Sequence, residues 1–376
     1  MCGVRVGNFV PEHVLQVIGA DGFAHTYLVS RTGMKCLPAA KLPSAHGNVL
    51  HDSHAEIIAV RTFNRFLLDQ CSSLARDASG NSPYIRRRQS SEITDISQQP
   101  FTIREDVTIH LYGSEAPCGD ASMEVIMAAQ DDATPWQVPQ SLGTDTDLKG
   151  RGSFAELGIV RRKPARPDAP TTLSKSCTDK LAMYQFTSIL NSLTSLFISP
   201  ENAYIATFTV PESQYVPSAF TRAFSANGRL QRATTECVAE YKYHPFVAQT
   251  TTLEFSWSRR AIPAGHRAIP SNVSAVHTPV FTEVLINGVL QGRKVGDPKG
   301  ASNICRSSMW KVARELAETE GTENVMQALD NPTYGGGKAA EILASRRELK
   351  EQVINTALKG WVNNTGDDKF SLDCLW

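Results

Sequence analysis

Two stretches in the N-terminal third alternate between hydrophobic and polar positions and are rich in β-branched and aromatic residues. They are "HTYLVS" at residues 25–30 and "DVTIHLYGS" at residues 106–114. Such alternation is typical of a strand that buries one face. Each stretch precedes a segment with helical character, so the pattern predicts an α/β sandwich that begins β, α, β, α.

The second half of the chain predicts further elements of both kinds. The segment "EVLINGVLQG" reads as a hairpin because Asn287 and Gly288 form the strongest short-range signal for a two-residue turn. Other strands are expected near 203–210 and 251–257, and helices near 301–318 and 338–360.

Two polar stretches interrupt this series. Residues 71–105 have almost no apolar pattern, so we expect a flexible insertion in which the Arg86-Arg87-Arg88 triplet is solvated. Residues 131–175, with "PWQVPQ", "GRGSF" and "RRKPARPDAP", are also expected to be irregular. The chain has no internal repeat and no clean linker. The simplest organisation is therefore one elaborated domain covering residues 1–376.

Composition and charge narrow the functional classes only slightly. Of 376 residues, 41% are hydrophobic and 20% are charged, which is ordinary for a globular protein. The 38 Lys and Arg residues balance the 38 Asp and Glu residues, so local basic patches would have to hold any nucleic acid. The N-terminus has no signal-peptide pattern, and no stretch approaches the roughly 18 apolar residues of a membrane span. We therefore expect an intracellular protein.

The segment "DSHAEIIAVR" at residues 52–61 raises the first chemical question. It places His54 and Glu56 two positions apart, just before a helical run. One interpretation is an ordinary helix start, since Ser53 and Glu56 fit a capping box. The other is half of a metal site that moves protons. This segment alone favours neither interpretation.

Thiolates elsewhere would favour the metal site. The eight cysteines are scattered, and in a reducing compartment metal binding or burial is expected rather than disulfides. Cys118 follows Pro117 just past a predicted strand, where we expect the first turn of a helix and N–H groups that stabilise a thiolate. His54 and Cys118 would then start two successive helices beside one sheet. They could converge on a zinc ion.

A third protein ligand is needed for a catalytic zinc. Nucleoside deaminases use H-x-E followed by P-C-x-x-C, but the position of the second cysteine is Ala121 here. Cys177 is a candidate because a polar turn precedes it and a helical stretch follows. Spacing alone does not favour it over Cys36 or Cys237.

In this order, "HAEII", "PCGDAS" and "SCTDKLA" resemble the adenosine deaminases that act on RNA. The resemblance covers most of the chain, because "TGMKC", "GNVLHDSHAE", "GASNICRSSMW" and the C-terminal "TYGGGKAAEILASRRELKEQVINTALKGWV" with "DDKFSL" match the same family. Ser122 and "RRKPARPD" at residues 161–168 favour its tRNA-specific branch. Each motif alone is weak, whereas the combination is specific.

This resemblance implies a fold and a catalytic centre. The fold is a cytidine-deaminase-like α/β sandwich, a central mixed sheet with flanking helices, elaborated into a single editase domain with additional C-terminal helices. Its zinc-site core would cover about residues 20–190 and the C-terminal elaboration about 191–376. The implied zinc ligands are His54, Cys118 and Cys177, with a water as the fourth ligand and Glu56 as the proton shuttle that turns adenosine into inosine.

Other residues are expected to support this centre. Asp52 and Lys180 would orient the zinc ligands from outside, since such partners set ligand geometry and basicity. Lys35 and Gly47 would line the nucleotide pocket. Candidates for phosphate contacts are Arg161, Arg162, Lys163 and Arg166, for which a mobile basic loop is the alternative.

The resemblance also implies inositol hexakisphosphate in a buried basic cavity. Many cations can be buried together only with a dense anion, because an unpaired buried charge is costly. Val60, Met183 and Ala344 depart from the family pattern and remove individual contacts. The matching positions are Arg61, Lys180, Arg306, Tyr334, Lys338, Arg346 and Trp361.

The implied substrate is tRNA, with the adenosine at position 37 of alanine tRNA, 3′ of the anticodon, as the target. An adenosine deaminase for other structured RNA and a catalytically silent RNA-binding subunit are the alternatives. No obligatory protein partner is inferred, and nuclear and cytoplasmic residence are both open.

Overall fold

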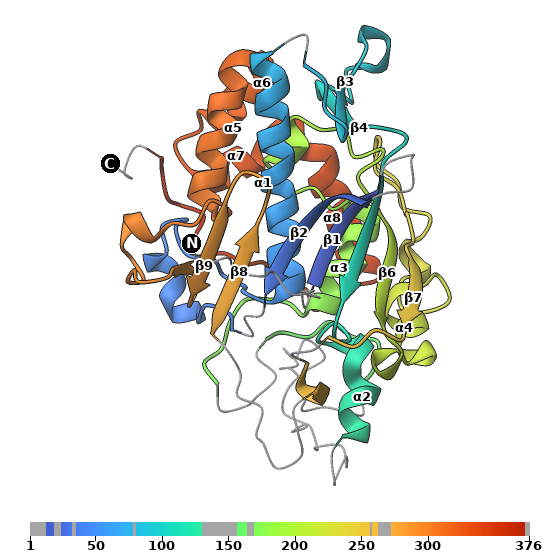
Figure 1. Cartoon of the computed structure of the whole chain (residues 1–376). Coiled ribbons are helices and arrows are strands. Elements are labelled where there is room, and N and C mark those ends of the chain that lie inside the picture. The colour runs from blue at the N-terminus through green and yellow to red at the C-terminus, as the bar shows by residue number, and fades with distance from the viewer. Residues whose placement is uncertain are drawn as a thin grey trace, which may run out of the picture.

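The computed structural model describes residues 13–18, 24–31, 35–77, 80–129, 156–163, 169–255, 258–261 and 272–372. Its centre is a mixed sheet with the strand order β10-β9-β8-β2-β1-β5-β6-β7 (Figure 1). β5 pairs parallel with β6 and β6 parallel with β7, whereas the other pairs are antiparallel. The strands are β1 His13–Ile18, β2 Ala24–Arg31, β5 Thr108–Gly113, β6 Ile205–Pro211, β7 Val247–Thr251, β8 Val273–His277, β9 Thr282–Ile286 and β10 Val289–Leu290.

The helices share one core with the sheet. Alternate residues of β5 are buried, among them Ile109 and Leu111, and they face Phe63 of α1 and Phe186 of α3 in the same hydrophobic cluster. Figure 1 shows that α1 crosses β1 and β2, with α5 beside it. The helices are α1 Ala55–Arg76, α2 Met123–Ala128, α3 Cys177–Thr187, α4 Pro217–Phe224, α5 Arg306–Glu320, α6 Glu323–Leu329, α7 Tyr334–Ala339 and α8 Ala344–Thr356.

The mixed α/β class predicted from the sequence is confirmed. Residues 25–30 lie within β2, and the predicted strand at 106–114 contains β5. Strand β2 pairs with β8, so the N-terminal strands lie next to the C-terminal strands β8, β9 and β10 in the same sheet (Figure 1). Neither β1 nor β8 was predicted.

The predicted hairpin at Asn287 and Gly288 is confirmed. Both residues have positive φ, 54° and 84°, as a type I′ turn between β9 and β10 requires. The strand predicted near 203–210 is β6. The strand predicted near 251–257 is misplaced, because β7 ends at Thr251. Of the two C-terminal helices, the first is α5, and the second is divided into α7 and α8.

The prediction that residues 71–105 lack regular structure is wrong. Helix α1 continues to Arg76, and β3 (Ile85–Arg87) pairs with β4 (Phe101–Ile103). The arginine triplet is not simply solvated either. Arg86 forms ion pairs with Glu92 (2.7 Å) and Glu105, Arg87 pairs with Glu320, and Arg88 donates to backbone carbonyls. The polar pattern hid this hairpin because β3 and β4 have only three residues each.

The other irregular stretch is described only in part, since residues 130–155 and 164–168 lie outside the described residues. Across the described ranges, the helices are too short or too polar to traverse a lipid bilayer.

Candidate active site

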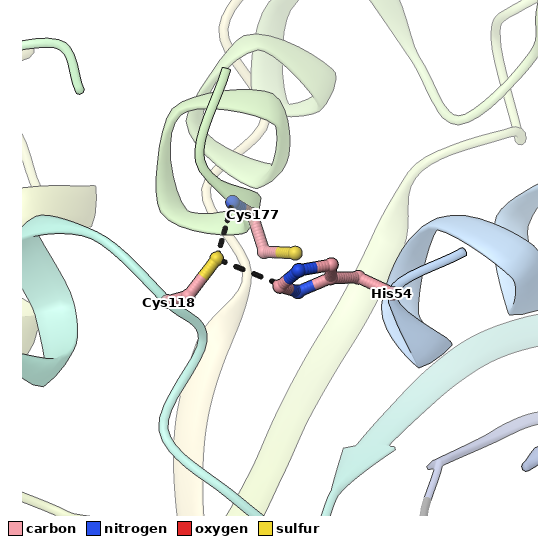
Figure 2. A group of neighbouring side chains, drawn as sticks. All are labelled: His54, Cys118 and Cys177. Atoms are coloured by element: carbon pink, nitrogen blue, oxygen red, sulfur yellow. Dashed lines mark hydrogen bonds between the residues drawn. The ribbon is translucent and has the colours of Figure 1, made fainter. Parts of the chain in front are cut away.

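The three predicted metal ligands converge from separate segments of the chain (Figure 2). His54 is the N-cap of α1, Cys177 is the first residue of α3, and Cys118 lies in the loop that follows β5. Thr178 ties the two cysteine segments together, because its N–H donates to the Cys118 carbonyl (3.0 Å) and its hydroxyl to the Pro117 carbonyl (2.9 Å). Two helix N-termini thus meet at the cluster, and the Cys177 N–H at the start of α3 donates to Cys118 Sγ (3.3 Å), an arrangement that favours negative charge on this sulfur.

The spacing of the donor atoms fits zinc. One ligand atom from each of His54, Cys118 and Cys177 lies within 4.8 Å of the others. Cys118 Sγ is 3.6 Å from His54 Nδ1. Tetrahedral coordination with a Zn–N bond of about 2.05 Å and a Zn–S bond of about 2.3 Å puts N and S about 3.6 Å apart. One imidazole and two thiolates also make a donor set that zinc accepts.

The structure also distinguishes Cys177, Cys36 and Cys237, which sequence spacing left as alternatives for the third metal ligand. Cys177 is buried and joins His54 and Cys118, whereas Cys237 is exposed. Cys36 belongs to a second group, in which its Sγ, a carboxylate oxygen of Asp52 and a ring nitrogen of His54 lie within 4.8 Å of one another. Cys36 therefore lies beside the centre without joining the two sulfurs.

The two sulfurs of the centre differ in charge. A hydrogen bond from the Cys177 thiol, with the cations of Lys163 and His54, holds the pKa of Cys118 well below its usual range. Burial raises the pKa of Cys177, and the Cys118 thiolate raises it further. Zinc binds cysteine as thiolate, so binding would release any proton that the pair still carries.

The prediction that Cys118 lies in the first turn of a helix is wrong. A 3-10 helix begins at Asp120, and α2 follows it. Gly119 lies between, with a φ of 111°, and a Cβ there would be 2.3 Å from Ser176 Oγ. Only glycine allows the loop to pass so close to the start of α3, so a turn rather than a helix start places this sulfur.

Glu56 lies in the first turn of α1 and is 5% exposed. The capping box is absent, because the N-cap is His54 rather than Ser53 and no side chain caps the helix. In the described part of the chain, no hydrogen bond to the Glu56 carboxylate is present, and its charge raises the pKa of Cys177. Its place beside the metal donors, without a role as a cap, favours chemistry over capping.

Asp52 connects the centre to the residues behind it. Its carboxylate accepts hydrogen bonds from Lys163 Nζ (2.8 Å), Ser174 Oγ (2.6 Å), Lys180 Nζ and the His54 N–H (3.0 Å). Burial opposes its charge, but Lys163 and Lys180 hold the pKa of Asp52 well below its usual range. The anionic carboxylate therefore fixes the backbone at His54.

Lys163 extends this network to the metal ligands. Its Nζ lies 3.1 Å from Cys177 Sγ as well as beside Asp52, and its side chain is 6% exposed. This position contradicts the expectation that Lys163 contacts RNA phosphate. The sequence pattern did not predict this buried position of Lys163. A bridge between Arg162 and Lys175 directs Lys163 toward the interior, and both segments that it pairs were expected to be irregular.

The other predicted phosphate contacts have different outcomes. Arg161 is 1% exposed, its backbone N–H donates to Asp179 (2.9 Å) and its guanidinium to the Glu156 carbonyl, so it too faces inward rather than toward a ligand. Arg162 is half-buried. Arg166 lies outside the described residues.

The two predicted pocket residues also differ. Lys35 is exposed, and its carbonyl accepts the Ser53 N–H (3.0 Å), so it lies next to the metal-ligand segment. Gly47 is not at an open pocket. Its N–H donates to Asp367 (2.7 Å), and a Cβ there would be 2.4 Å from the Phe370 ring. Its small size serves packing against the C-terminal segment.

Behind Asp52 lies a cavity of about 150 Å³. Arg61, Lys180 and Arg306 of the predicted inositol-phosphate set line it, together with His51. Arg61 donates to the Ile304 carbonyl (2.9 Å), and the Arg306 guanidinium lies 5.5 Å from the Tyr334 ring centre. Asp367 also pairs with His51 (2.6 Å) and Arg306 (3.5 Å).

More cations gather around Trp361, which lies between Lys175 Nζ (4.9 Å) and Lys350 Nζ (5.7 Å). Burial and the charges of Lys338 and Arg346 lower the pKa of Lys350 to about 8. Burial, Lys180 and Lys350 hold the pKa of Lys175 well below its usual range. Burial causes the larger part of each pKa shift, and repulsion between the neighbouring cations adds to it. We call Arg61, Lys175, Lys180, Arg306, Lys338, Arg346 and Lys350 the cation cluster.

Two buried N–H groups in this region fit an anion. Arg346 Nε and Trp361 Nε1 have no hydrogen-bond partner within the described ranges. Such buried donors are rare in folded proteins, and phosphate oxygens would satisfy them while neutralising the cations. Val60 and Met183, which replace expected contacts, are buried in the main hydrophobic cluster. The residues present therefore fit a polyphosphate.

Comparisons with known proteins agree with this geometry. Residues 31–365 match the model of the adenosine-deaminase (editase) domain. The chain is 36% identical to tRNA-specific adenosine deaminase 1 of Schizosaccharomyces pombe over 343 residues, which cover 90% of this chain and 82% of that protein. It is 37% identical to tRNA-specific adenosine deaminase 1 of Saccharomyces cerevisiae over 195 residues, 49% of this chain and 46% of that one. With double-stranded RNA-specific editase B2 of Mus musculus it shares 27% over 205 residues, 50% of this chain and 25% of that one.

The match spans most of the chain, including the segments that carry His54, Cys118 and Cys177. The protein belongs to the adenosine-deaminase (editase) domain family.

Proposed function

We propose that this protein converts adenosine to inosine in tRNA by hydrolytic deamination, with zinc held by His54, Cys118 and Cys177. The observation that carries the proposal is the meeting of three donors at zinc-like spacing, with Glu56 buried beside them. Family membership supports the reaction, and similarity to tRNA-specific deaminases supports the class of substrate.

Zinc, when bound, would lower the pKa of a water toward 7 and so supply a nucleophile at neutral pH. Glu56 takes a proton from the attacking water and delivers it to N1 of the adenine, which makes C6 more electrophilic. The water oxygen bonds to C6, Glu56 takes the remaining proton from that C6 hydroxyl group and gives it to the amino group, the C6–N bond breaks, and ammonia leaves. Lys163 favours the thiolate of Cys177, and Asp52 holds the backbone of His54 in place.

Within tRNA, we propose position 37 of alanine tRNA as the target. A base in the anticodon loop is already outside a regular duplex, so moving it into a pocket costs less than extracting it from a paired stem. The similarity to tRNA-specific deaminases and the resemblance of residues 161–168 to the tRNA-specific branch support this choice.

We further propose inositol hexakisphosphate as the anion of the cation cluster. It would neutralise the repelling cations and accept hydrogen bonds from Arg346 Nε and Trp361 Nε1. Acid extraction of purified protein followed by phosphate analysis should release about one inositol polyphosphate per chain. Release of none would overturn this part of the proposal.

The central test measures inosine formation on alanine tRNA by the wild type and by Glu56→Gln, with zinc content as the control for folding. The wild type should form inosine, and the variant should keep its zinc and lose about 10²- to 10⁴-fold in turnover. Normal turnover by the variant would overturn the proton role. Equal activity on a long RNA duplex would favour the broader RNA deaminase, and a zinc-loaded but inactive wild type would favour the silent RNA-binding subunit.

A further inference from the structure

Four exposed cations lie on the two segments that flank the approach to His54. Lys41 is in the 3-10 helix Ala39–Ser44. Arg293 and Lys294 are in the turn that follows β10, and Lys299 is in the 3-10 helix Pro298–Gly300 that precedes α5. We call these four residues the flank patch. In Figure 1 the turn after β9 and β10 lies at one side of the sheet, and β7 lies at the other.

Both segments are fastened to the chain that leads into His54. On one side, the Leu37 N–H donates to the His51 carbonyl (2.9 Å). On the other side, the Leu50 N–H donates to the Gly288 carbonyl (2.9 Å). Leu42, Val49 and Val289 pack in one buried cluster beneath them. The two segments that carry the flank patch are therefore anchored to the chain that leads into His54, and Lys35 is anchored to the same chain through its carbonyl, which accepts the Ser53 N–H.

The local charge is strongly positive although the whole chain is neutral. Residues 35–51 and 287–300 contain five Lys and Arg residues and one acidic residue, Asp297. Asp297 is 3.9 Å from Arg293, a surface pair of little strength. The loop that carries Cys118 is different, because Glu115 and Glu254 both pair with Arg260 there, at 2.9 and 2.8 Å. Of these regions, the exposed positive charge thus lies on residues 35–51 and 287–300, whereas Lys163, the cation beside the sulfurs, is buried.

We propose that the flank patch binds the sugar–phosphate backbone of the tRNA next to the nucleotide that is deaminated. This inference rests on the proposed function, because it requires an RNA strand at the metal centre. Exposed Lys and Arg side chains on a fixed support bind phosphates without reading sequence and set the register of the strand. The patch would supply the binding that the neutral chain as a whole cannot.

The test compares two double charge reversals of equal size. One is Arg293→Glu with Lys294→Glu in the flank patch. The matched control is Arg232→Glu with Lys242→Glu, two exposed residues on the segments between α4 and β7, toward the opposite edge of the sheet. Steady-state deamination of tRNA gives kcat and KM, and tRNA binding at several salt concentrations gives the salt dependence of Kd. Zinc content verifies folding of both variants.

We expect the patch variant to raise KM for tRNA by about tenfold or more with kcat unchanged, and to lower the slope of log Kd against log salt by about 1.5. The control should stay within about twofold of the wild type. A patch variant that matches the control in KM and in salt slope would overturn this inference, as would a loss of kcat alone. Failure of the wild type to form inosine in tRNA would instead overturn the proposed function.

Discussion

The metal centre and the cation cluster favour ions of opposite charge: the metal centre favours a cation, and the cation cluster favours an anion. The first gathers a nitrogen and two sulfurs that suit a metal cation, with Glu56 beside them. The second gathers seven Lys and Arg residues, and burial together with neighbouring cations lowers the pKa values of four of them, Arg61, Lys175, Lys338 and Lys350. Asp52 separates them, since it contacts His54 and Lys163 on one side and Lys180 on the other. The two regions thus suit ions of opposite charge, and the buried carboxylate of Asp52 lies between them and contacts residues of both.

The largest effect should come from removing a metal donor. Cys177→Ser should lose zinc and reduce deamination to background, because the remaining imidazole and thiolate do not complete a three-ligand site. Zinc content and inosine formation measure both effects. Cys237→Ser, an exposed cysteine, is the matched control and should leave both unchanged. If Cys177→Ser retained its zinc, the assignment of Cys177 as a zinc ligand would be wrong.

Asp52→Asn should disturb both regions at once. The amide cannot compensate two lysines, so we expect a loss of about 10- to 100-fold in zinc affinity or turnover, as is typical for outer partners of metal ligands. Polyphosphate content should fall in the same variant, because Lys180 loses its partner at the cavity. A variant that loses activity but keeps its polyphosphate would show that Asp52 serves the metal centre alone.

Two lysine variants sharpen the comparison by addressing one side each. Lys163→Met should weaken zinc binding, since Lys163 lies 3.1 Å from Cys177 Sγ, while polyphosphate content stays near that of the wild type. Lys180→Met should lower polyphosphate content with a smaller effect on zinc. Zinc and phosphate analyses of the same preparations give both values. Parallel losses in both variants would mean that the regions act as one unit.

The smallest effect concerns stability and pH. Lys350 has a pKa of about 8 in the folded protein against 10.5, so folding disfavours its charged form. This penalty is fully present below pH 8, and it decreases as the pH rises from about 8 toward 10.5. Thermal unfolding of polyphosphate-free protein should therefore show a rise in stability over this range.

Added inositol hexakisphosphate should remove that rise and increase the Tm at pH 7. At a concentration 100-fold above Kd, the gain in the free energy of unfolding is about 2.7 kcal/mol. Lys350→Met should reduce the rise without added ligand, whereas Lys175 and Lys338, whose pKa values are also lowered, should account for the remainder. A Tm that inositol hexakisphosphate leaves unchanged would contradict the assignment of the cation cluster.

Local patterns predicted the positions of the candidate metal donors better than the positions of the residues around them. His54 and Cys177 are at helix starts as expected, because capping and periodicity are encoded within a few residues. Lys163 was assigned to RNA, whereas it lies buried beside Asp52, because a bridge between two loops decides its direction. Lys175 was not predicted at all, and only its position beside Trp361 reveals its part in the cation cluster.

The sequence by itself determined the α/β class, the hairpin at Asn287 and Gly288 and the candidate donors, because alternation, turn chemistry and short motifs act over a few residues. The family resemblance already pointed to Cys177, whereas only the tertiary structure decided that Lys163 faces inward and that the segments of Lys41 and Arg293 flank the same part of the chain. Those relations join residues far apart in the chain. They depend on packing between elements, which no local pattern of hydrophobic and polar residues specifies.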